Sequence, residues 1–188
     1  MRIPLLLLLT FFLISARPHM AFALCQEPSV TLPGDKSYCG PKTLSFSTTD
    51  PNHTPSYTAN SDGTISSYTW TVNGTVIATD RHPSINFPTA GTYEVTVTAT
   101  KSCGESASDT QLITIEDVPL APDVSNVATC TGSSATLWVS NPDPNLRYRW
   151  YDSNGNLLVW GTSYTKLNAT NSTYQIEAVT PGGCVSPR

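Results

Sequence analysis

The clearest pattern of apolar and polar positions runs from Phe87 to Ala99, where a Pro/Gly turn leads into a strict alternation. From residue 93 onward every second residue is apolar, and the residues between are Thr or Glu. This period of two predicts a β-strand with one face in a hydrophobic core and the other in solvent. A weaker copy of the pattern runs from Ser172 to Thr180. The apolar positions are Tyr93, Val95, Val97 and Ala99 in the first stretch, and Tyr174, Ile176 and Ala178 in the second.

Four landmark residues recur in the same order around these two strands, which predicts two units built on one plan. Each unit has a Cys, a Trp, a Tyr and a second Cys, and the Trp-to-Tyr and Tyr-to-Cys intervals agree within one residue. An Asn-Gly pair follows each Trp, at Asn73 and Asn154, and is a strong signal for a two-residue hairpin turn. The landmarks are Cys39, Trp70, Tyr93 and Cys103 in the first unit, and Cys130, Trp150, Tyr174 and Cys184 in the second.

Each unit is predicted to be a small β-sandwich, so the expected fold class is all-β with two tandem sandwiches. No stretch after residue 23 has sustained helical periodicity, and short alternating segments are separated by Gly, Pro and Asn. We assign residues 28–117 to the first sandwich, residues 118–122 to a Pro-stiffened linker and residues 123–188 to the second. We expect the landmark Trp of each unit between its two sheets, and the landmark Tyr at the start of the penultimate strand.

The two units differ after their last cysteine. In the first unit the chain continues into a further strand pattern, Thr110 to Ile115, that closes the sheet. Only Val185 to Arg188 follow Cys184, so we expect the second sandwich to lack its last strand and the chain to be a truncated piece of a longer protein. The strand that begins at Tyr174 is then expected to be an unpaired sheet edge.

Residues 1–23 are expected to be a cleaved signal peptide. Arg2 precedes an apolar run from Ile3 to Ile14 that is short for a membrane span, and Ala21-Phe22-Ala23 offers a small-x-small cleavage site. A membrane anchor and a lipoprotein with Cys25 at its start are alternatives, and the lipoprotein fits poorly because bulky Leu24 precedes the cysteine. We therefore expect a secreted or cell-surface protein with no membrane span after signal removal.

The charge balance restricts the kinds of partner. The formal net charge is −4, and charged residues make up 13% of the chain against roughly 25% in ordinary soluble domains. Thr and Ser supply much of the polar surface instead, and Thr suits the outward face of a strand. A polyanionic nucleic acid is therefore not expected as a partner.

Five cysteines leave one over in a compartment that permits disulfides. The repeat favours pairing within each unit, Cys39 with Cys103 and Cys130 with Cys184. Closing such a long loop stabilises a domain by roughly 4 kcal/mol in the chain-entropy model. Cys25 is then free, lost on processing, or paired with Cys39 in a rearranged form. No metal site is expected, because the chain has no Cys-x-x-Cys motif and its histidines lack ligand spacing.

No arrangement of residues predicts catalysis, so we expect a protein that is not an enzyme and that needs no cofactor. The nucleophile-elbow, phosphate-loop and His-Glu-x-x-His motifs do not occur in the sequence. His53 and His82, the two histidines after the signal, lie beside prolines or turn residues. Four scattered aspartates could form a calcium site, but turn capping is the favoured role of Asp50, Asp62, Asp80 and Asp109.

Three aromatic residues of the second unit, Trp138, Tyr151 and Trp160, are candidate carbohydrate contacts, because their positions are compatible with outward-facing rings. Trp138 and Tyr151 are expected on the outer faces of different sheets. This placement argues against a joint platform for one sugar chain.

The segment Tyr68-Thr69-Trp70 and the stretch from Asn86 to Ala99 carry a resemblance to a known family. They are similar to the Tyr-x-Trp strand and the closing Tyr-Pro-x-x-Gly-x-Tyr-x-Val-x-Leu of PKD (polycystic kidney disease) domains. Thr71-Val72-Asn73-Gly74 stands where that family has Asp-Phe-Gly-Asp-Gly, and Phe87 replaces its first Tyr, so the first unit looks like a divergent PKD-like sandwich.

A second set of motifs covers nearly the whole second unit. The motifs are Cys130-Thr131-Gly132, Ala135-Thr136-Leu137, Tyr148-Arg149-Trp150-Tyr151-Asp152, Gly161-Thr162-Ser163-Tyr164, Thr173-Tyr174 and Gly183-Cys184-Val185-Ser186-Pro187-Arg188. They resemble the Ig-like modules of large secreted and surface proteins of gliding bacteria of the Bacteroidetes type.

Together the two resemblances imply tandem non-catalytic modules of a multidomain surface protein. The implied partners are other domains of the same polypeptide, with surface glycans or proteins as further candidates. We expect a spacer or adhesion role, and the alternative is an accessory carbohydrate-binding region of a secreted polysaccharide-degrading enzyme.

Overall fold

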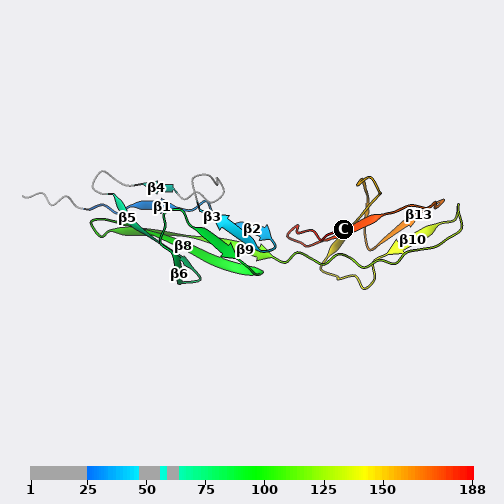
Figure 1. The fold of residues 1–188 in the computed structure, drawn as a ribbon, viewed down its shortest axis with the longest axis horizontal. Helices are drawn as coiled ribbons and strands as arrows, with labels where there is room; N and C mark the ends of the chain where they lie inside the picture. Colours follow the sequence, from blue (N-terminus) through cyan, green and yellow to red (C-terminus); the bar gives the residue numbers. More distant parts are fainter. Residues whose placement is uncertain (1–24, 47–55, 59–63) are drawn as a thin grey trace, which may run out of the picture.

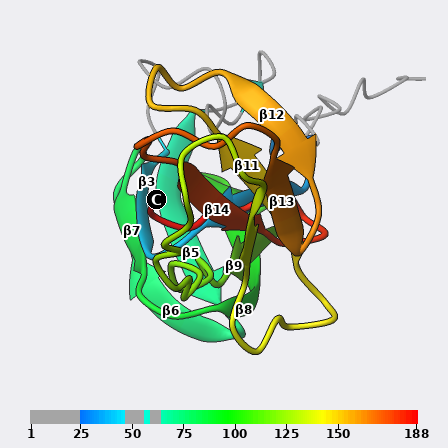
Figure 2. The ribbon, with the colours of Figure 1, turned by 90° about the vertical axis from the view of Figure 1, so that its right-hand side faces the viewer.

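The structure, a computed structural model, describes residues 25–46, 56–58 and 64–188, and their strands form two units placed end to end (Figure 1). Figure 2 looks at the molecule along its long axis, with the second unit in front of the first. No helix occurs among the described residues. The fold is all-β with two tandem units, as the alternating sequence pattern predicts.

The first unit is a sandwich of one large and two small sheets. Its strands are β1 (Ser29–Thr31), β2 (Lys36–Cys39), β3 (Lys42–Ser45), β4 (Ser56–Thr58), β5 (Ile65–Val72), β6 (Thr75–Ala78), β7 (Ser84–Phe87), β8 (Gly91–Lys101) and β9 (Ser106–Glu116). The large sheet has the order β2-β9-β8-β5-β6, and only the β2–β9 pair in it is parallel. The small sheets are β1 with β4 and β3 with β7.

The core of the first unit lies between these sheets, around the fully buried Trp70. The Trp70 ring lies 4.8 Å from the Phe46 ring, and its Nε1 donates a hydrogen bond of 2.9 Å to the Asp80 carbonyl. Tyr93 is half-buried at the start of β8, and its hydroxyl donates a 2.8 Å hydrogen bond to the Thr89 carbonyl. This back-bond is the defining contact of a tyrosine corner.

Strand β9 completes the first unit because it lies between β8 and β2. Ile113 of β9 is opposite Tyr93 of β8 and opposite Lys36 of β2. The side chains of Ile113 and Ile115 are only 0% and 2% exposed, so this part of β9 both closes the sheet and fills the core. Gly40 follows β2 and extends the pairing, because its amide donates a 2.8 Å hydrogen bond to the Glu116 carbonyl.

The second unit is a smaller sandwich of two sheets. Its strands are β10 (Ala135–Trp138), β11 (Arg147–Tyr151), β12 (Leu157–Trp160), β13 (Ser163–Lys166) and β14 (Gln175–Val179). One sheet pairs β10 with β13, and the other has the order β12-β11-β14. Trp150 is 1% exposed between them and donates from Nε1 to the Gly161 carbonyl at 2.9 Å. Tyr174 packs its ring 5.1 Å from that of Tyr164.

The outer edge of β14 is paired in part, whereas the sequence predicts it to be unpaired. Val185 forms a β-bridge with Val179, and the Ser186 amide donates a 2.9 Å hydrogen bond to the Ala178 carbonyl. The C-terminal segment therefore begins a strand along the last two residues of β14.

The cysteines pair differently from the expectation that each unit has its own disulfide. The bonds join Cys25 to Cys103 and Cys39 to Cys184, and Cys130 is free and exposed. The predicted Cys39–Cys103 pair is impossible because Cys103 lies before the start of β9 and Cys39 lies beside its end. The 11 residues of β9 span about 35 Å, far beyond the roughly 4–7 Å between the Cα atoms of a disulfide.

The predicted Cys130–Cys184 pair fails for the same reason in the second unit. Gly132 donates its amide to the Ala169 carbonyl, so the Cys130 segment lies near the residues that precede β14. Cys184 follows the other end of that strand.

Candidate functional site

A group of covalent and polar contacts lies at the junction between the two units. A disulfide joins Cys39, the last residue of β2, to Cys184, in the turn after β14, with a Cα separation of 5.4 Å. Cys39 is placed there by its parallel pairing with Glu116, the last residue of β9. The bond therefore connects the two units directly, across 145 positions of sequence.

Glu116 adds noncovalent contacts at the same place. Its Oε2 accepts a 3.3 Å hydrogen bond from the Thr180 hydroxyl, and the Cys184 sulfur lies 3.6 Å from that oxygen. The Thr180 hydroxyl in turn accepts a 3.0 Å hydrogen bond from the Cys184 amide. A Cβ atom added to Gly182 would overlap the Glu116 carboxylate as it is placed, so glycine permits this close approach. These contacts fix how the second unit sits on the first.

A buried carboxylate organises the outer face of the β12-β11-β14 sheet. Glu177 is 5% exposed and accepts a 2.7 Å hydrogen bond from the Tyr151 hydroxyl. Arg188 donates from Nε to its other oxygen at 2.8 Å, and Arg149 forms a second ion pair with it. Burial by itself raises the pKa of a carboxylate, but the Tyr151 and Arg188 hydrogen bonds and the guanidinium charges outweigh it, so the pKa of Glu177 lies below its usual value.

The three candidate carbohydrate contacts lie in different surroundings. Tyr151 is on the outer face but is only 7% exposed, and the Arg188 guanidinium covers its ring at 3.7 Å, so it offers no open face to a sugar. Trp138 is 52% exposed on β10, and Trp160 is 40% exposed on β12. Since β10 and β12 belong to different sheets, the structure does not bring the three residues into one platform.

Trp160 is partly covered by cations. The guanidinium carbons of Arg147 and Arg149 lie 4.3 Å and 5.1 Å from the centroid of its ring. These distances are in the range of cation–π contacts. Trp138 therefore has the more accessible ring of the two.

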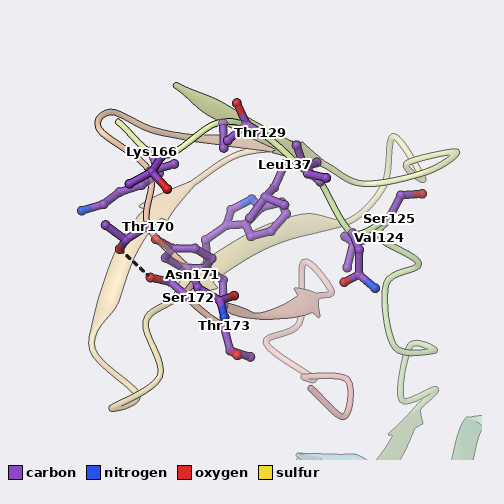
Figure 3. Close-up of a pocket in the computed structure, with 17 residues that line it drawn as sticks. Val124, Ser125, Thr129, Leu137, Lys166, Thr170, Asn171, Ser172 and Thr173 are labelled. Atoms are coloured by element: carbon purple, nitrogen blue, oxygen red, sulfur yellow. Dashed lines mark hydrogen bonds between the residues drawn. The ribbon is translucent and has the colours of Figure 1, made fainter. Parts of the chain in front are cut away.

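A groove of about 600 Å³ opens in the second unit between residues 124–131 and residues 169–174 (Figure 3). Trp150, Leu137 and Tyr174 supply its apolar and aromatic lining, and Lys166 is its one charged lining residue among the described side chains. Figure 3 shows Thr129 and Leu137 across the groove from Thr170–Thr173. Most of the remaining lining residues are Ser, Thr and Asn.

The histidines and aspartates considered for metal or calcium binding lie only partly within the described residues. Among residues 25–46 and 64–188, no group of three or more His, Cys, Asp or Glu is arranged to hold a metal ion. Asp109 accepts a 2.6 Å hydrogen bond from the Leu32 amide, and His82 Nδ1 lies 3.1 Å from the Phe46 carbonyl. His53, Asp50 and Asp62 lie outside the described residues. Among the described residues, no helix is long and apolar enough to cross a membrane.

Two family models match the chain, each over one unit. Residues 25–116 match the PKD domain, and residues 119–188 match the Ig-like domain described as CHU_C associated. The chain is a PKD domain followed by a CHU_C-associated Ig-like domain. Only residues 117–118 separate the two matches, directly after Glu116 of the domain junction.

Part of the chain is also similar in sequence to a known protein. The pre-pro-metalloprotease PrtV of Vibrio cholerae serotype O1 is 29% identical over 102 residues, which are 53% of this chain and 11% of that protein. The chain thus spans a small part of the length of this relative. The PKD assignment and the two disulfides are consistent with an extracellular location.

Two solved structures align with most of this chain, and the first of them exceeds a TM-score of 0.5. The three N-terminal domains of the Hoc protein of bacteriophage RB49 align with a TM-score of 0.51 at 16% identity, over 81% of this chain and 62% of that one. The fibronectin(III)-like modules of Clostridium thermocellum CbhA align with a TM-score of 0.46 at 14% identity, over 85% and 90% of the two chains. At such identities the likeness concerns the fold alone.

Sequence reasoning did not find the residues that make the domain junction or the buried carboxylate cluster. Glu116 and Gly182 gain their role from a contact between two domains, which no local pattern reports. Glu177 occupies an ordinary outward position of an alternating strand, and its partner Arg188 lies beyond a turn. The pair Gly182-Gly183 beside Cys184 was the available signal, because a residue without a Cβ lets another group approach its backbone closely.

Proposed function

We propose that the PKD and Ig-like domains form a rigid, non-catalytic spacer within a larger secreted or cell-surface protein. The observation that carries the proposal is the Cys39–Cys184 disulfide, which joins the domains directly beside the Glu116 contact. Two domains connected only by a short linker move relative to one another by default. A covalent bond across the interface removes most of that freedom and suits a segment that holds other domains at a fixed distance.

The same bond changes how the chain carries tension. A force applied between the two ends of the chain passes along the shortest covalent path. That path leaves the backbone at Cys39 and returns to it at Cys184, so residues 40–183 carry no load. The Ig-like domain and the part of the PKD domain after Cys39 are thereby protected from mechanical unfolding while the disulfide is intact, and only β1 and β2 remain in the load path.

Single-molecule force spectroscopy with handles at both ends tests the proposal. We expect no release of residues 40–183 in the oxidised protein, and full extension after reduction. The 145 positions between the two cysteines would then release about 500 Å of contour length at roughly 3.5 Å per residue.

A matched pair of variants separates the inter-domain bond from general effects of thiols. Cys39→Ser with Cys184→Ser keeps the Cys25–Cys103 bond, so it should release the residues after Cys103 but less length than the reduced protein. Cys130→Ser should behave like the oxidised protein. Release of the full length from the oxidised protein would contradict the rigid-spacer proposal.

An accessory carbohydrate-binding region is the second candidate, supported by the exposed rings of Trp138 and Trp160. Aromatic rings open to solvent can stack on sugars, and Trp138 is the less covered of the two. The proposal predicts retention on an insoluble polysaccharide that Trp138→Ala abolishes. Leu120→Ala, which removes an apolar side chain that is 89% exposed elsewhere, is the matched control. Absence of retention on a broad panel of polysaccharides would remove this candidate.

A further inference from the structure

The outer face of the β12-β11-β14 sheet carries more positive charge than its one carboxylate neutralises. Arg147 and Arg149 lie on this face, because the residue between them, Tyr148, is buried in the core. Arg149 and Arg188 both pair with Glu177. Arg147 is exposed and forms no ion pair among the described residues. Three guanidinium groups and one carboxylate leave an excess of two positive charges here, in a chain whose net charge is −4.

Arg147 is held by an aromatic ring instead of a carboxylate. Its guanidinium carbon lies 4.3 Å from the centroid of the Trp160 ring, and Trp160 is directly opposite Arg149 in the β11–β12 ladder. A guanidinium over an aromatic ring uses its flat face for that contact and keeps the N–H donors at its edges. A planar group oriented in this way loses little freedom when it binds a carboxylate through two parallel hydrogen bonds. Arg147 therefore has donors for a further carboxylate.

The sheet is open beside Trp160. Among the described residues β12 pairs only with β11, and all four residues of β12 are exposed. Trp160 is 40% exposed even with the two arginines against it. A carboxylate bound by Arg147 thus brings the molecule that carries it against an aromatic ring and an apolar strand edge. A ligand that suits this face combines an anionic group with a flat apolar surface.

We propose that this face binds an acidic polysaccharide through the carboxylates of its uronic acid units. A uronate carries its carboxylate on a sugar ring whose C–H face is apolar, so a single unit offers a partner to both Arg147 and Trp160. An acidic peptide has the carboxylates but no flat apolar face beside each one. The open edge at β12 leaves room for a polymer to continue past the site.

The inference rests on the second candidate function, because it names a ligand class for the exposed ring of Trp160. It does not depend on the rigid spacer, since none of these residues takes part in the Cys39–Cys184 junction.

Isothermal titration calorimetry of the full chain, with both disulfides intact, tests the proposal with oligogalacturonate as the probe. We expect saturable binding that weakens as the salt concentration rises, because exposed charges are screened by salt. A neutral oligoglucoside of the same length should not bind. Polyglutamate, which supplies carboxylates without sugar rings, should bind more weakly than oligogalacturonate.

Substitutions on the proposed face locate the site. Arg147→Glu and Trp160→Ala should abolish binding, and Arg147→Lys should weaken it about tenfold, because a point charge replaces two parallel hydrogen bonds. Lys42→Ala is the matched control in the PKD domain, where the Lys42 ammonium lies 6.0 Å from the centroid of the Tyr38 ring. It removes an exposed cation over an aromatic ring and should leave binding unchanged. Because the substituted side chains are exposed, circular dichroism should show all variants folded.

Several results would overturn the proposal. They are failure of oligogalacturonate to bind, equal binding of polyglutamate or of the neutral oligoglucoside, and equal losses in Lys42→Ala and Arg147→Glu. Binding of dextran sulfate without binding of oligogalacturonate would assign the face to sulfated glycans instead. Retention on a neutral polysaccharide that Trp138→Ala abolishes and Arg147→Glu leaves intact would support the second candidate function and overturn this inference alone.

Discussion

The PKD and Ig-like domains follow one plan, but among the described residues a strand pairs along the whole of β8 and along only part of the outer edge of β14. Strand β9 pairs with β8 along its whole length and contributes Ile113 and Ile115 to a core of 11 buried residues. The Ig-like core has 5 buried residues, and β14 has a partner on its outer edge only at Ala178 and Val179. The difference suggests that a domain with a smaller hydrophobic core depends more on other stabilising contacts. In the Ig-like domain these are the Cys39–Cys184 disulfide to the PKD domain and the buried Glu177 cluster.

Removal of the inter-domain disulfide should have the largest effect. In the chain-entropy model a closed loop of 145 residues stabilises the folded state by about 5 kcal/mol. We expect Cys39→Ser with Cys184→Ser to lower the urea midpoint of the Ig-like domain more than that of the PKD domain, which keeps Cys25–Cys103. The Trp fluorescence of the two domains reports the transitions.

Cys130→Ser is the control for this experiment and should leave both midpoints unchanged, because that thiol is free and exposed. Equal losses in the two domains would show that the Ig-like domain does not depend on the junction more than its neighbour does.

Substitution of the two core tryptophans compares the stabilities of the two domains directly. Trp70→Ala and Trp150→Ala each remove a fully buried ring and should destabilise their own domain by about 3–5 kcal/mol. Because the Ig-like core is smaller, we expect Trp150→Ala to leave that domain unfolded at room temperature and Trp70→Ala to leave the PKD domain folded. Amide hydrogen exchange, resolved by domain, measures both. The opposite ranking would mean that core size does not decide the difference.

The strands could be predicted from the sequence, whereas the contacts between distant segments could not. The alternation around Tyr93 and the Asn-Gly turns are local signals, so they predict the positions of strands and turns. They also place Trp70 and Trp150 in the predicted cores. The disulfide pairing depends on which end of a long strand each cysteine occupies, and on how two domains meet. Cys39 therefore pairs outside its own domain, which an assumption of independent repeats cannot foresee.

The buried Glu177 cluster predicts a dependence on pH that distinguishes the two domains. The folded pKa of Glu177 is lowered, so the cluster stabilises the Ig-like domain fully above the unfolded carboxyl pKa. That contribution is lost as the pH falls through the lowered folded pKa. Denaturation at neutral and acidic pH should show the loss in the wild type.

Glu177→Gln is the matched variant for this pH dependence. It should cost about 2 kcal/mol at neutral pH, because it removes hydrogen bonds that involve a charged group. It should also flatten the pH profile of the Ig-like domain. A profile as steep as that of the wild type would assign the acid sensitivity to other carboxylates.

The smallest expected effect concerns the close approach at the junction. Gly182→Ala places a methyl group against the Glu116 carboxylate, which must turn away and give up its hydrogen bond from Thr180. Since the end of a Glu side chain moves easily, we expect a loss of about 1 kcal/mol, the worth of one such hydrogen bond. Pro181→Ala changes the neighbouring residue without entering the contact and is the control.

If Gly182→Ala leaves the stability of the disulfide-bonded protein unchanged but weakens the variant that lacks Cys39 and Cys184, the noncovalent contact acts only where the covalent bond is missing. If both backgrounds lose the same amount, the carboxylate and the disulfide stabilise the junction independently. We expect the two losses to differ, because the Cys184 sulfur lies 3.6 Å from the Glu116 carboxylate and the Cys184 amide shares the Thr180 hydroxyl with it.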